Sequence, residues 1–168
     1  LPAGPVSGTV LGRPGSGAPP EGPCSRLQQA HKSHPPAVLI PWNELPVPTA
    51  ARLYRLERDV WATRYGWETI DAWQEVERGR VLGTVPGYAL VDAQGAVLGW
   101  TYFVVHRGML QVGGLCAERT DVTTRLVAAI LESAHRVDAA GVTVFIPDEA
   151  PGLVDALTGS GLSVEPYR

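Results

Sequence analysis

The alternation of apolar and polar positions is most regular between Met109 and Ala134. An apolar run from Leu110 to Ala117, with two glycines at its middle, predicts a buried strand. After a polar break at residues 118–121, apolar side chains recur with the period of an amphipathic helix, which we expect over residues 121–139. The residues that set this period are Val122, Leu126, Ile130 and Ala134. The stretch therefore predicts a strand that runs directly into a helix.

The start of this helix has features of an anion site. Thr120 or Asp121 can cap its first turn, because a short side-chain oxygen can accept hydrogen bonds from the unpaired N–H groups there. A helix N-terminus also carries the positive end of the helix dipole, so it suits a pyrophosphate. An ordinary strand–helix corner of an α/β core would show the same pattern, and the pattern alone leaves both interpretations open.

The same periodicities predict the other elements. Their ranges are a strand at 38–40, helices at 48–63 and 70–78, and strands at 88–91, 96–106 and 142–146. A short helix with Pro151 near its first turn follows, closed by Gly159 and Gly161, and a last strand begins at Leu162. Short turns join the strands at 88–91, 96–106 and 110–117 into an antiparallel meander. The segment from 110 to 146 predicts a βαβ unit with parallel strands, its helix stopped by Gly141. The predicted fold class is α+β (α/β mixed), with a central mixed sheet of about six strands and two N-terminal helices.

The helix at 48–63 carries both apolar and charged residues. Leu53, Leu56 and Val60 are predicted to face the core, with Tyr54 and Trp61 beside them. The charged residues Arg52, Arg55, Glu57, Arg58 and Asp59 are predicted to form a solvated face.

Composition separates a tail from a folded domain. Residues 1–36 hold 8 Pro and 6 Gly and are predicted to be a disordered tail. Residues 37–168 are predicted to be one domain, which the end at Arg168 can cut short. A net charge of −3 argues against nucleic-acid binding, and no apolar run is long enough to span a membrane. Cys24 and Cys116 lack the spacing of a metal site or a disulfide framework, so we expect no metal and a reducing, cytoplasmic setting.

Two phrases and the element order point to a known family. The turn phrase LVDAQGAVLGW at 90–100 and the closing phrase LTGSGLSVEPY at 157–167 are similar to those of the GNAT superfamily of acyl-CoA-dependent N-acyltransferases. This resemblance covers residues 37–168. It implies a GNAT-like sheet whose central strand splays from its parallel neighbour, with the pantetheine arm of acetyl-CoA in the gap and the pyrophosphate at the helix N-terminus. The cofactor-binding residues that it implies are Leu115, Cys116, Ala117, Asp121, Val122, Thr123, Thr124 and Arg125.

The chain also departs from the family pattern. The phosphate loop is usually an Arg/Gln-x-x-Gly-x-Gly/Ala run, but ERTDVTTR at 118–125 is shorter and contains no glycine. Ala150 stands where an Asn is common, and Leu157 stands where a Tyr often protonates the departing thiolate. The resemblance is therefore to a divergent branch with an abbreviated loop.

Acyl transfer to an amine needs a proton acceptor for the amine and a proton donor for the thiolate. Candidate catalytic residues are His106 and Glu118 as acceptors and Tyr167 as the donor. Each acceptor has another interpretation: His106 can be a surface residue near a turn, and Glu118 can pair with Arg119. Cys116 in an apolar strand is typical of packing rather than of a nucleophile.

The predicted function follows from the resemblance. It is transfer of an acetyl group from acetyl-CoA, as co-substrate, to a small-molecule or amino-terminal amine by a monomer or homodimer. Aromatic residues predicted to line the acceptor pocket, if they do not serve only in packing, are Trp61, Tyr65, Trp67 and Tyr102. The alternative is a catalytically inactive GNAT-fold domain with a ligand-binding or regulatory role.

Overall fold

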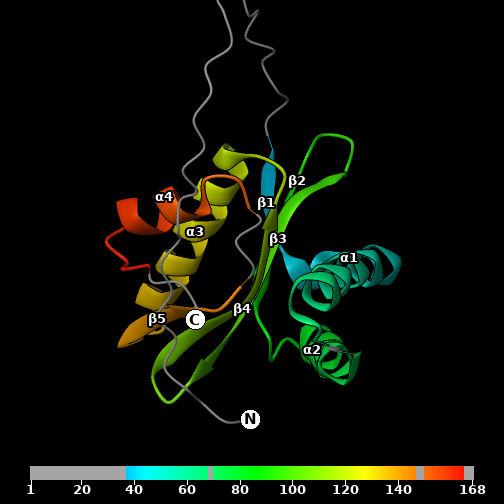
Figure 1. Cartoon of the computed structure of the whole chain (residues 1–168), viewed down its shortest axis with the longest axis horizontal. Helices are drawn as coiled ribbons and strands as arrows, with labels where there is room; N and C mark the ends of the chain where they lie inside the picture. The colour runs from blue at the N-terminus through cyan, green and yellow to red at the C-terminus, as the bar shows by residue number, and fades with distance from the viewer. Residues whose placement is uncertain (1–36, 68–69, 147–149, 165–168) are drawn as a thin grey trace, which may run out of the picture.

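A computed structural model describes residues 37–67, 70–146 and 150–164 (Figure 1). Within these residues one mixed sheet has the strand order β1-β2-β3-β4-β5. In chain order the elements are β1 (Val38–Pro41), the 3-10 helix η1 (Trp42–Glu44), α1 (Val47–Tyr65), α2 (Ile70–Leu82), β2 (Gly87–Val91), β3 (Val97–His106), β4 (Met109–Ala117), α3 (Thr120–Arg136), β5 (Gly141–Val144) and α4 (Leu153–Gly159). The predicted mixed α+β class is confirmed. The predicted tail at 1–36 lies outside the described residues.

Strand directions follow the predicted connections. The strands β1 to β4 pair antiparallel in sequence order, whereas β4 and β5 pair parallel across α3. The turn between β2 and β3 is closed by Asp92, whose carboxylate accepts hydrogen bonds from the backbone N–H groups of Gln94 and Ala96. Gly95 in this turn has a φ of 80°, a conformation that glycine adopts without steric cost.

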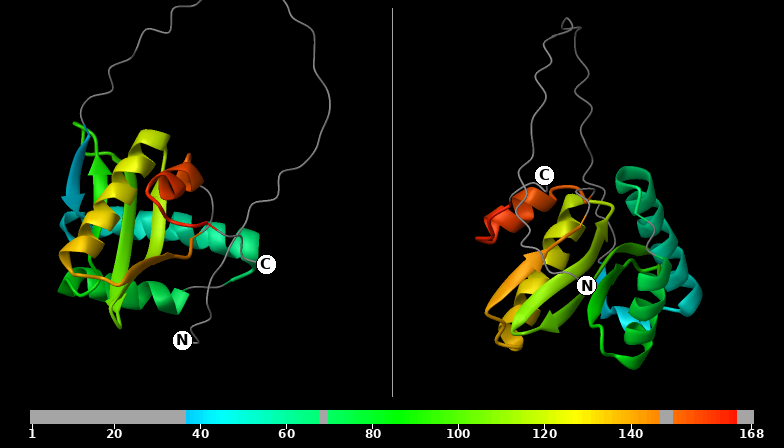
Figure 2. Two further views of the ribbon diagram at one scale, coloured as in Figure 1. Left: turned by 90° about the vertical axis from the view of Figure 1, so that its left-hand side faces the viewer. Right: turned by 60° about the horizontal axis from the view of Figure 1, so that its bottom comes forward.

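The helices cover both faces of the sheet. Figures 1 and 2 show α3 and α4 on one face and α1 and α2 on the other. The face under α3 has an aliphatic core that includes Leu110, Val112, Leu115, Val122, Leu126 and Ile130. A β-carbon at Gly99 would lie 2.5 Å from Cγ1 of Val122, so the first turn of α3 packs directly on the backbone of β3.

The face under α1 and α2 has an aromatic core. Trp42 stacks on Tyr102 with ring centroids 5.0 Å apart, and Tyr54 stacks on Trp73 at 4.9 Å. Arg80 on α2 is buried within this layer and donates hydrogen bonds to the carbonyl oxygens of Trp42, Asn43 and Leu45. Its guanidinium also pairs with the carboxylate of Glu77, with Nε 2.6 Å from Oε2. Because its donors are paired, a buried charge can hold α2 against η1.

The face of α1 that is buried differs from the predicted one. The buried residues of α1 are Ala50, Leu53, Tyr54, Glu57 and Trp61, whereas Leu56 is 59% exposed. The large rings of Tyr54 and Trp61 set the inward face, because they bury more apolar area than Leu56 and Val60 would. Glu57 lies between them in the helical repeat, so its prediction as a solvated residue is wrong.

The predicted ends of the βαβ helix need correction. The N-cap of α3 is Arg119, whose side chain makes no capping hydrogen bond and instead binds the carboxylate of Asp121. At its other end α3 stops at Arg136, and Asp138 takes the left-handed conformation with a φ of 51°. Gly141, predicted to stop this helix, instead begins β5.

The predicted sixth strand is also absent from the described residues. Leu162–Val164 lie outside the five strands. After the left-handed Gly161, the N–H of Leu162 donates to the carbonyl of Leu157, which turns the chain back on α4.

Candidate functional site

The pairing of β4 with β5 ends halfway along β4. It extends from Met109 opposite Gly141 to Val112 opposite Val144, and no register continues beyond it. Residues 113–117 of β4 therefore have no strand partner on the β5 side among the described residues. In the left view of Figure 2, the chain of β5 (orange) leaves the direction of β4. Backbone N–H and C=O groups along such an edge can pair with polar groups of an extended ligand.

A bulge of β4 lies at the point where the strands part. Tyr102 pairs with Gly114 and Phe103 pairs with Val112, so Gly113 is an extra residue in β4. The ring of Tyr102 lies against both glycines: a β-carbon at Gly113 would overlap the ring, and one at Gly114 would lie 2.5 Å from Cε1. Only glycine allows this close approach, and a bulge of this kind locally disrupts the ladder.

Glu57 reaches Gly114 of this glycine pair from α1. A β-carbon at Gly114 would lie 2.8 Å from both carboxylate oxygens of Glu57. Glu57 is only 2% exposed; its Oε1 accepts a 3.4 Å hydrogen bond from Nε1 of Trp61, and its Oε2 has no hydrogen-bond partner among the described residues. Burial raises the pKa of Glu57 to about 8, an effect that the Trp61 hydrogen bond only partly opposes. The site thus holds a carboxyl group that titrates in the physiological range.

An aromatic cluster adjoins Glu57 at the C-terminal end of α1. We call Trp61, Tyr65, Trp67 and Phe145 the ring cluster. Trp61 stacks on Trp67 at 5.3 Å with an interplanar angle of 1°, and Phe145 lies 5.6 Å from Trp61. Tyr65 and Trp67 are each 41% exposed, so the cluster extends from the buried carboxyl to the surface.

Three of the four predicted acceptor-pocket residues thus belong to the ring cluster. The fourth, Tyr102, lies on β3 beneath Glu57 and over the glycine pair. Burial, and then the nearby charge of Glu57, raises the pKa of Tyr102 above its usual value. Its hydroxyl group therefore stays protonated, so it can donate or accept a hydrogen bond but does not supply a phenolate.

The residues predicted to bind the cofactor phosphates lie at the first turns of α3, where several polar groups are already paired. Asp121 forms a two-pronged contact with Arg119, with both N···O distances 2.9 Å. This guanidinium, assisted by the backbone N–H groups of Asp121 and Val122, holds the pKa of Asp121 below its usual value. The carboxylate of Asp121 therefore lies where an anionic ligand would bind.

The hydroxyl and guanidinium groups that follow are also engaged. The hydroxyl groups of Thr123 and Thr124 donate to the carbonyls of Arg119 and Thr120, one turn earlier. Arg125 is exposed and donates a 3.0 Å hydrogen bond to the carbonyl of Ala37. Val122 is fully buried, so only its backbone N–H can serve a ligand.

The predicted cofactor residues on β4 all lie on the edge that leaves β5. Leu115 is buried in the aliphatic core under α3, whereas Cys116 and Ala117 are half-buried. A ligand that pairs with this edge would use their backbone groups, since the Leu115 side chain serves the core.

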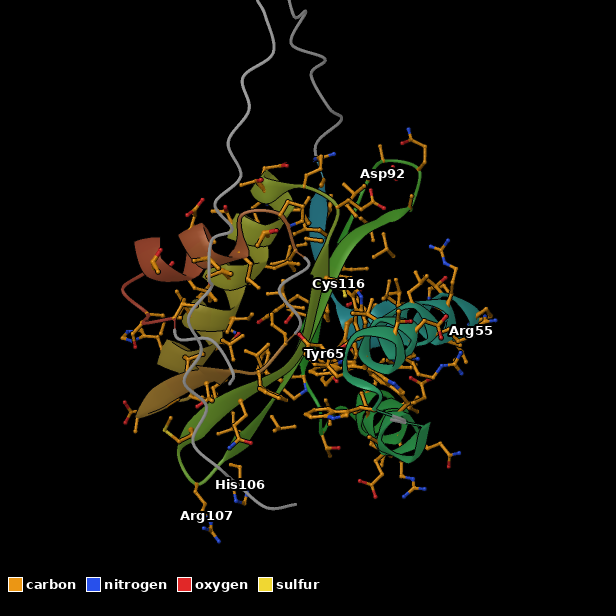
Figure 3. All side chains as sticks on the ribbon, in the orientation of Figure 1. Arg55, Tyr65, Asp92, His106, Arg107 and Cys116 are labelled. Carbon is orange, nitrogen blue, oxygen red and sulfur yellow. The ribbon has the colours of Figure 1, made fainter. Side chains whose placement is uncertain are left out.

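The residues predicted to move protons lie in different places. His106 is exposed opposite Met109 at the tip of the β3–β4 hairpin, far along the strand from Cys116 (Figure 3). Glu118 is exposed just beyond β4, with its backbone N–H bonded to the carbonyl of Leu98. Tyr167 lies outside the described residues. The structure therefore does not bring His106 to the free edge of β4, and Glu118 follows the end of that edge.

Glu57 is the polar residue that the sequence interpretation missed. A signal was present: Tyr54 and Trp61 occur three residues before it and four after it, which is the spacing of one helix face. A carboxylate between two large rings would then have been expected to face inward with them.

Among the residues that the structure describes, no helix is long and apolar enough to span a membrane. Nor do these residues contain a group of three or more His, Cys, Asp or Glu side chains that could hold a metal ion.

Comparison with known proteins places the fold. No family model and no curated protein matches the sequence. A solved structure described as a possible acetyltransferase from Clostridium difficile 630 superimposes with a TM-score of 0.56, covering 79% of this chain and 93% of that chain at 9% identity. The protein TTHA1254 from Thermus thermophilus, solved as a mutant, matches more loosely, with a TM-score of 0.44 and 17% identity over 55% of this chain and 72% of that chain. The first of these superpositions shows that the chain has an acetyltransferase-like fold.

Proposed function

We propose that this protein is a GNAT-type N-acyltransferase that moves an acetyl group from acetyl-CoA to an amine. The observation that carries the proposal is the parting of β4 from β5 at the glycine bulge. It leaves the backbone of residues 113–117 without a strand partner among the described residues, next to a buried carboxyl group and the ring cluster. An acetyltransferase-like fold with this opening suits a donor that lies along a strand edge.

The chemistry assigns a role to each part of this region. The pantetheine amides would pair with the backbone of Leu115 to Ala117, and a backbone N–H of β4 would stabilise the oxyanion that forms at the thioester carbonyl. The diphosphate would lie at the first turn of α3, where it would accept hydrogen bonds from the N–H group of Val122 and the guanidinium of Arg125. Asp121 would have to turn away from that turn, taking Arg119 with it.

The pairing of Asp121 favours a second candidate function. A carboxylate at the first turn of α3 competes with phosphate oxygens for the same donors. A domain that keeps this pair closed would be a catalytically inactive member of the same fold, with a ligand-binding or regulatory role.

Calorimetric titration with acetyl-CoA separates these functions. We expect saturable binding, and we expect Arg125→Ala to weaken it about tenfold, because a charge-assisted hydrogen bond to phosphate is lost. Arg136→Ala is the matched control: this arginine lies at the other end of α3, pairs with Glu132, and should leave the affinity unchanged. Absence of binding at millimolar acetyl-CoA would overturn the proposal and leave the inactive domain.

A further inference from the structure

Glu57 has a buried carboxyl oxygen that lacks a hydrogen-bond partner among the described residues. Its carboxylate is almost fully buried, and Oε2 has no partner among the residues that the structure describes. Buried polar groups are nearly always paired, because an unpaired one loses its hydration without compensation. Arg80, the buried charge on the other helix of this face, has its donors paired with Glu77 and with backbone carbonyls. The fold thus provides hydrogen-bond partners for Arg80 but not for Oε2 of Glu57 among the described residues.

The groups around Glu57 favour a positively charged ligand. The carboxyl is bonded to Trp61 of its own helix and lies against Gly114 of β4, with Tyr102 of β3 close enough to feel its charge. Tyr102 in turn lies near Tyr54 and Cys116. None of these groups is a cation, so no positive charge in the described part of the chain neutralises Glu57 there. A cationic ligand would supply both the missing charge and the missing donor.

The ring cluster indicates which substituent a bound cation would carry. Trp61 donates to Glu57 and stacks on Trp67, which reaches the surface together with Tyr65. Ring faces attract cations and pack against flat or apolar groups. An amine that carries an aromatic or apolar group matches both parts of the region.

We propose that the Glu57 carboxyl group binds a cationic primary amine that carries an aromatic or apolar substituent, and that it accepts the proton of this amine during acyl transfer. The proton-transfer role rests on the proposed function, whereas the amine-binding role does not. The ring cluster holds the substituent. Because the Glu57 carboxyl lies against Gly114 of β4, the bound amine nitrogen would lie beside the strand edge where the thioester would lie.

The reaction balances with these groups alone. The ammonium gives one proton to the Glu57 carboxylate, and the amine nitrogen forms a bond to the thioester carbonyl carbon. The carbon–sulfur bond then breaks with its electron pair on sulfur. A second proton of the amine goes to the thiolate, and the third stays on the product amide. The net products are an amide, a free thiol and one proton, which Glu57 returns to water.

Proton release on binding tests the amine site directly. Near pH 7 the Glu57 carboxyl is mostly protonated, so formation of a carboxylate–ammonium pair must release close to one proton per molecule bound. The probe is benzylamine, titrated into the full chain by calorimetry in two buffers that differ in ionisation enthalpy. The expected result is binding with this release. Benzyl alcohol and methylamine, which lack the charge and the ring respectively, should each bind at least about tenfold more weakly.

Two variants complete the test. Glu57→Gln keeps the shape of the side chain, and we expect it to abolish proton release and to weaken benzylamine binding at least about tenfold. Asp59→Asn, an exposed carboxylate on the same helix, should behave as the wild type. Binding without proton release, equal affinity in Glu57→Gln, or no benzylamine binding at millimolar concentration would each overturn the amine site.

Acetyl transfer distinguishes this inference from the proposed function. With acetyl-CoA and benzylamine, Glu57→Gln should lower kcat/KM at least about 100-fold while leaving acetyl-CoA affinity unchanged. If acetyl-CoA binds but the variant transfers as fast as the wild type, the proton-transfer role of Glu57 fails alone. If acetyl-CoA does not bind while benzylamine still releases a proton, the proposed function fails and the amine site stands.

Discussion

Polar side chains at the first turn of α3 have hydrogen-bond partners within the protein, whereas the carboxyl group beside the glycine pair of β4 is only partly paired. At α3, Asp121 is paired with Arg119, and the hydroxyl groups of Thr123 and Thr124 are bonded to the preceding turn. At β4, Glu57 faces the glycines with one oxygen unpaired among the described residues. A ligand at α3 must displace contacts that folding has already made, whereas a cation at Glu57 would add one that folding left unmade. In the proposed enzyme the amine side of the site would therefore be preformed, whereas the phosphate side would not be.

The largest expected effect concerns the pH dependence of stability and the charge of Glu57. Its pKa is 4.5 without burial and about 8 in the folded protein. Between these values the folded protein holds a proton that the unfolded chain releases, so stability falls as the pH rises. At about 1.4 kcal/mol per pKa unit, the free energy of unfolding should fall by roughly 3 kcal/mol between pH 5 and pH 8.

Urea denaturation at both pH values measures this fall. Glu57→Gln should remove it, since the amide does not titrate, and the variant should be more stable than the wild type at the higher pH. Asp59→Asn should keep the wild-type pH dependence. Parallel pH dependences for Glu57→Gln and the wild type would show that the carboxyl is not desolvated as the structure indicates.

An intermediate effect is expected for Gly114→Ala. The new methyl group would lie 2.5 Å from Cε1 of Tyr102 and 2.8 Å from the Glu57 oxygens, while Trp42 stacks on Tyr102. Overpacking of this kind should lower the free energy of unfolding by about 1–3 kcal/mol, as measured by chemical denaturation. Gly159→Ala is the control, because nothing lies within 4 Å of its β-carbon. Equal stability of the two variants would contradict the close approach of strand, ring and carboxyl.

The smallest effect on stability is expected for Asp121→Asn, since exposed ion pairs contribute little to stability. Its thermal midpoint should stay near that of the wild type, while calorimetry should show acetyl-CoA binding several-fold more tightly, because a competing carboxylate is gone. Glu132→Gln, an exposed carboxylate near the other end of α3, should leave the affinity unchanged. Weaker acetyl-CoA binding to Asp121→Asn would mean that Asp121 supports the donor site instead of blocking it.

Apolar periodicity predicted most of the elements, because local patterns encode which face is buried. The meander, the βαβ unit and the long helix after β4 all follow from it. The end of β5 did not: the apolar run continues to Ile146, but Phe145 packs on Trp61 and Trp67 across the sheet edge, so pairing ends at Val144. Nothing in the local sequence specifies that tertiary contact.

The candidate site was less predictable than the fold. The ring cluster was visible as a dense set of aromatic residues, and the free edge of β4 was implied by the family resemblance. Glu57 was missed, because its residue type favours solvent and only the neighbouring rings place it inside. The Arg119–Asp121 pair was missed for a similar reason: a short-range ion pair took the carboxylate that had been assigned to the cap.

Arg80 has a consequence for how an amine would reach Glu57 in the proposed site. In the last turn of α2, the Arg80 guanidinium donates hydrogen bonds to three carbonyl groups around η1. It also pairs with Glu77 of α2, which accepts a hydrogen bond from the hydroxyl of Tyr54 on α1. These hydrogen bonds therefore hold the two helices to each other and to η1 at this end. For the proposed amine, the exposed rings of Tyr65 and Trp67 at the opposite end of α1 would then be the side of approach to the buried carboxyl.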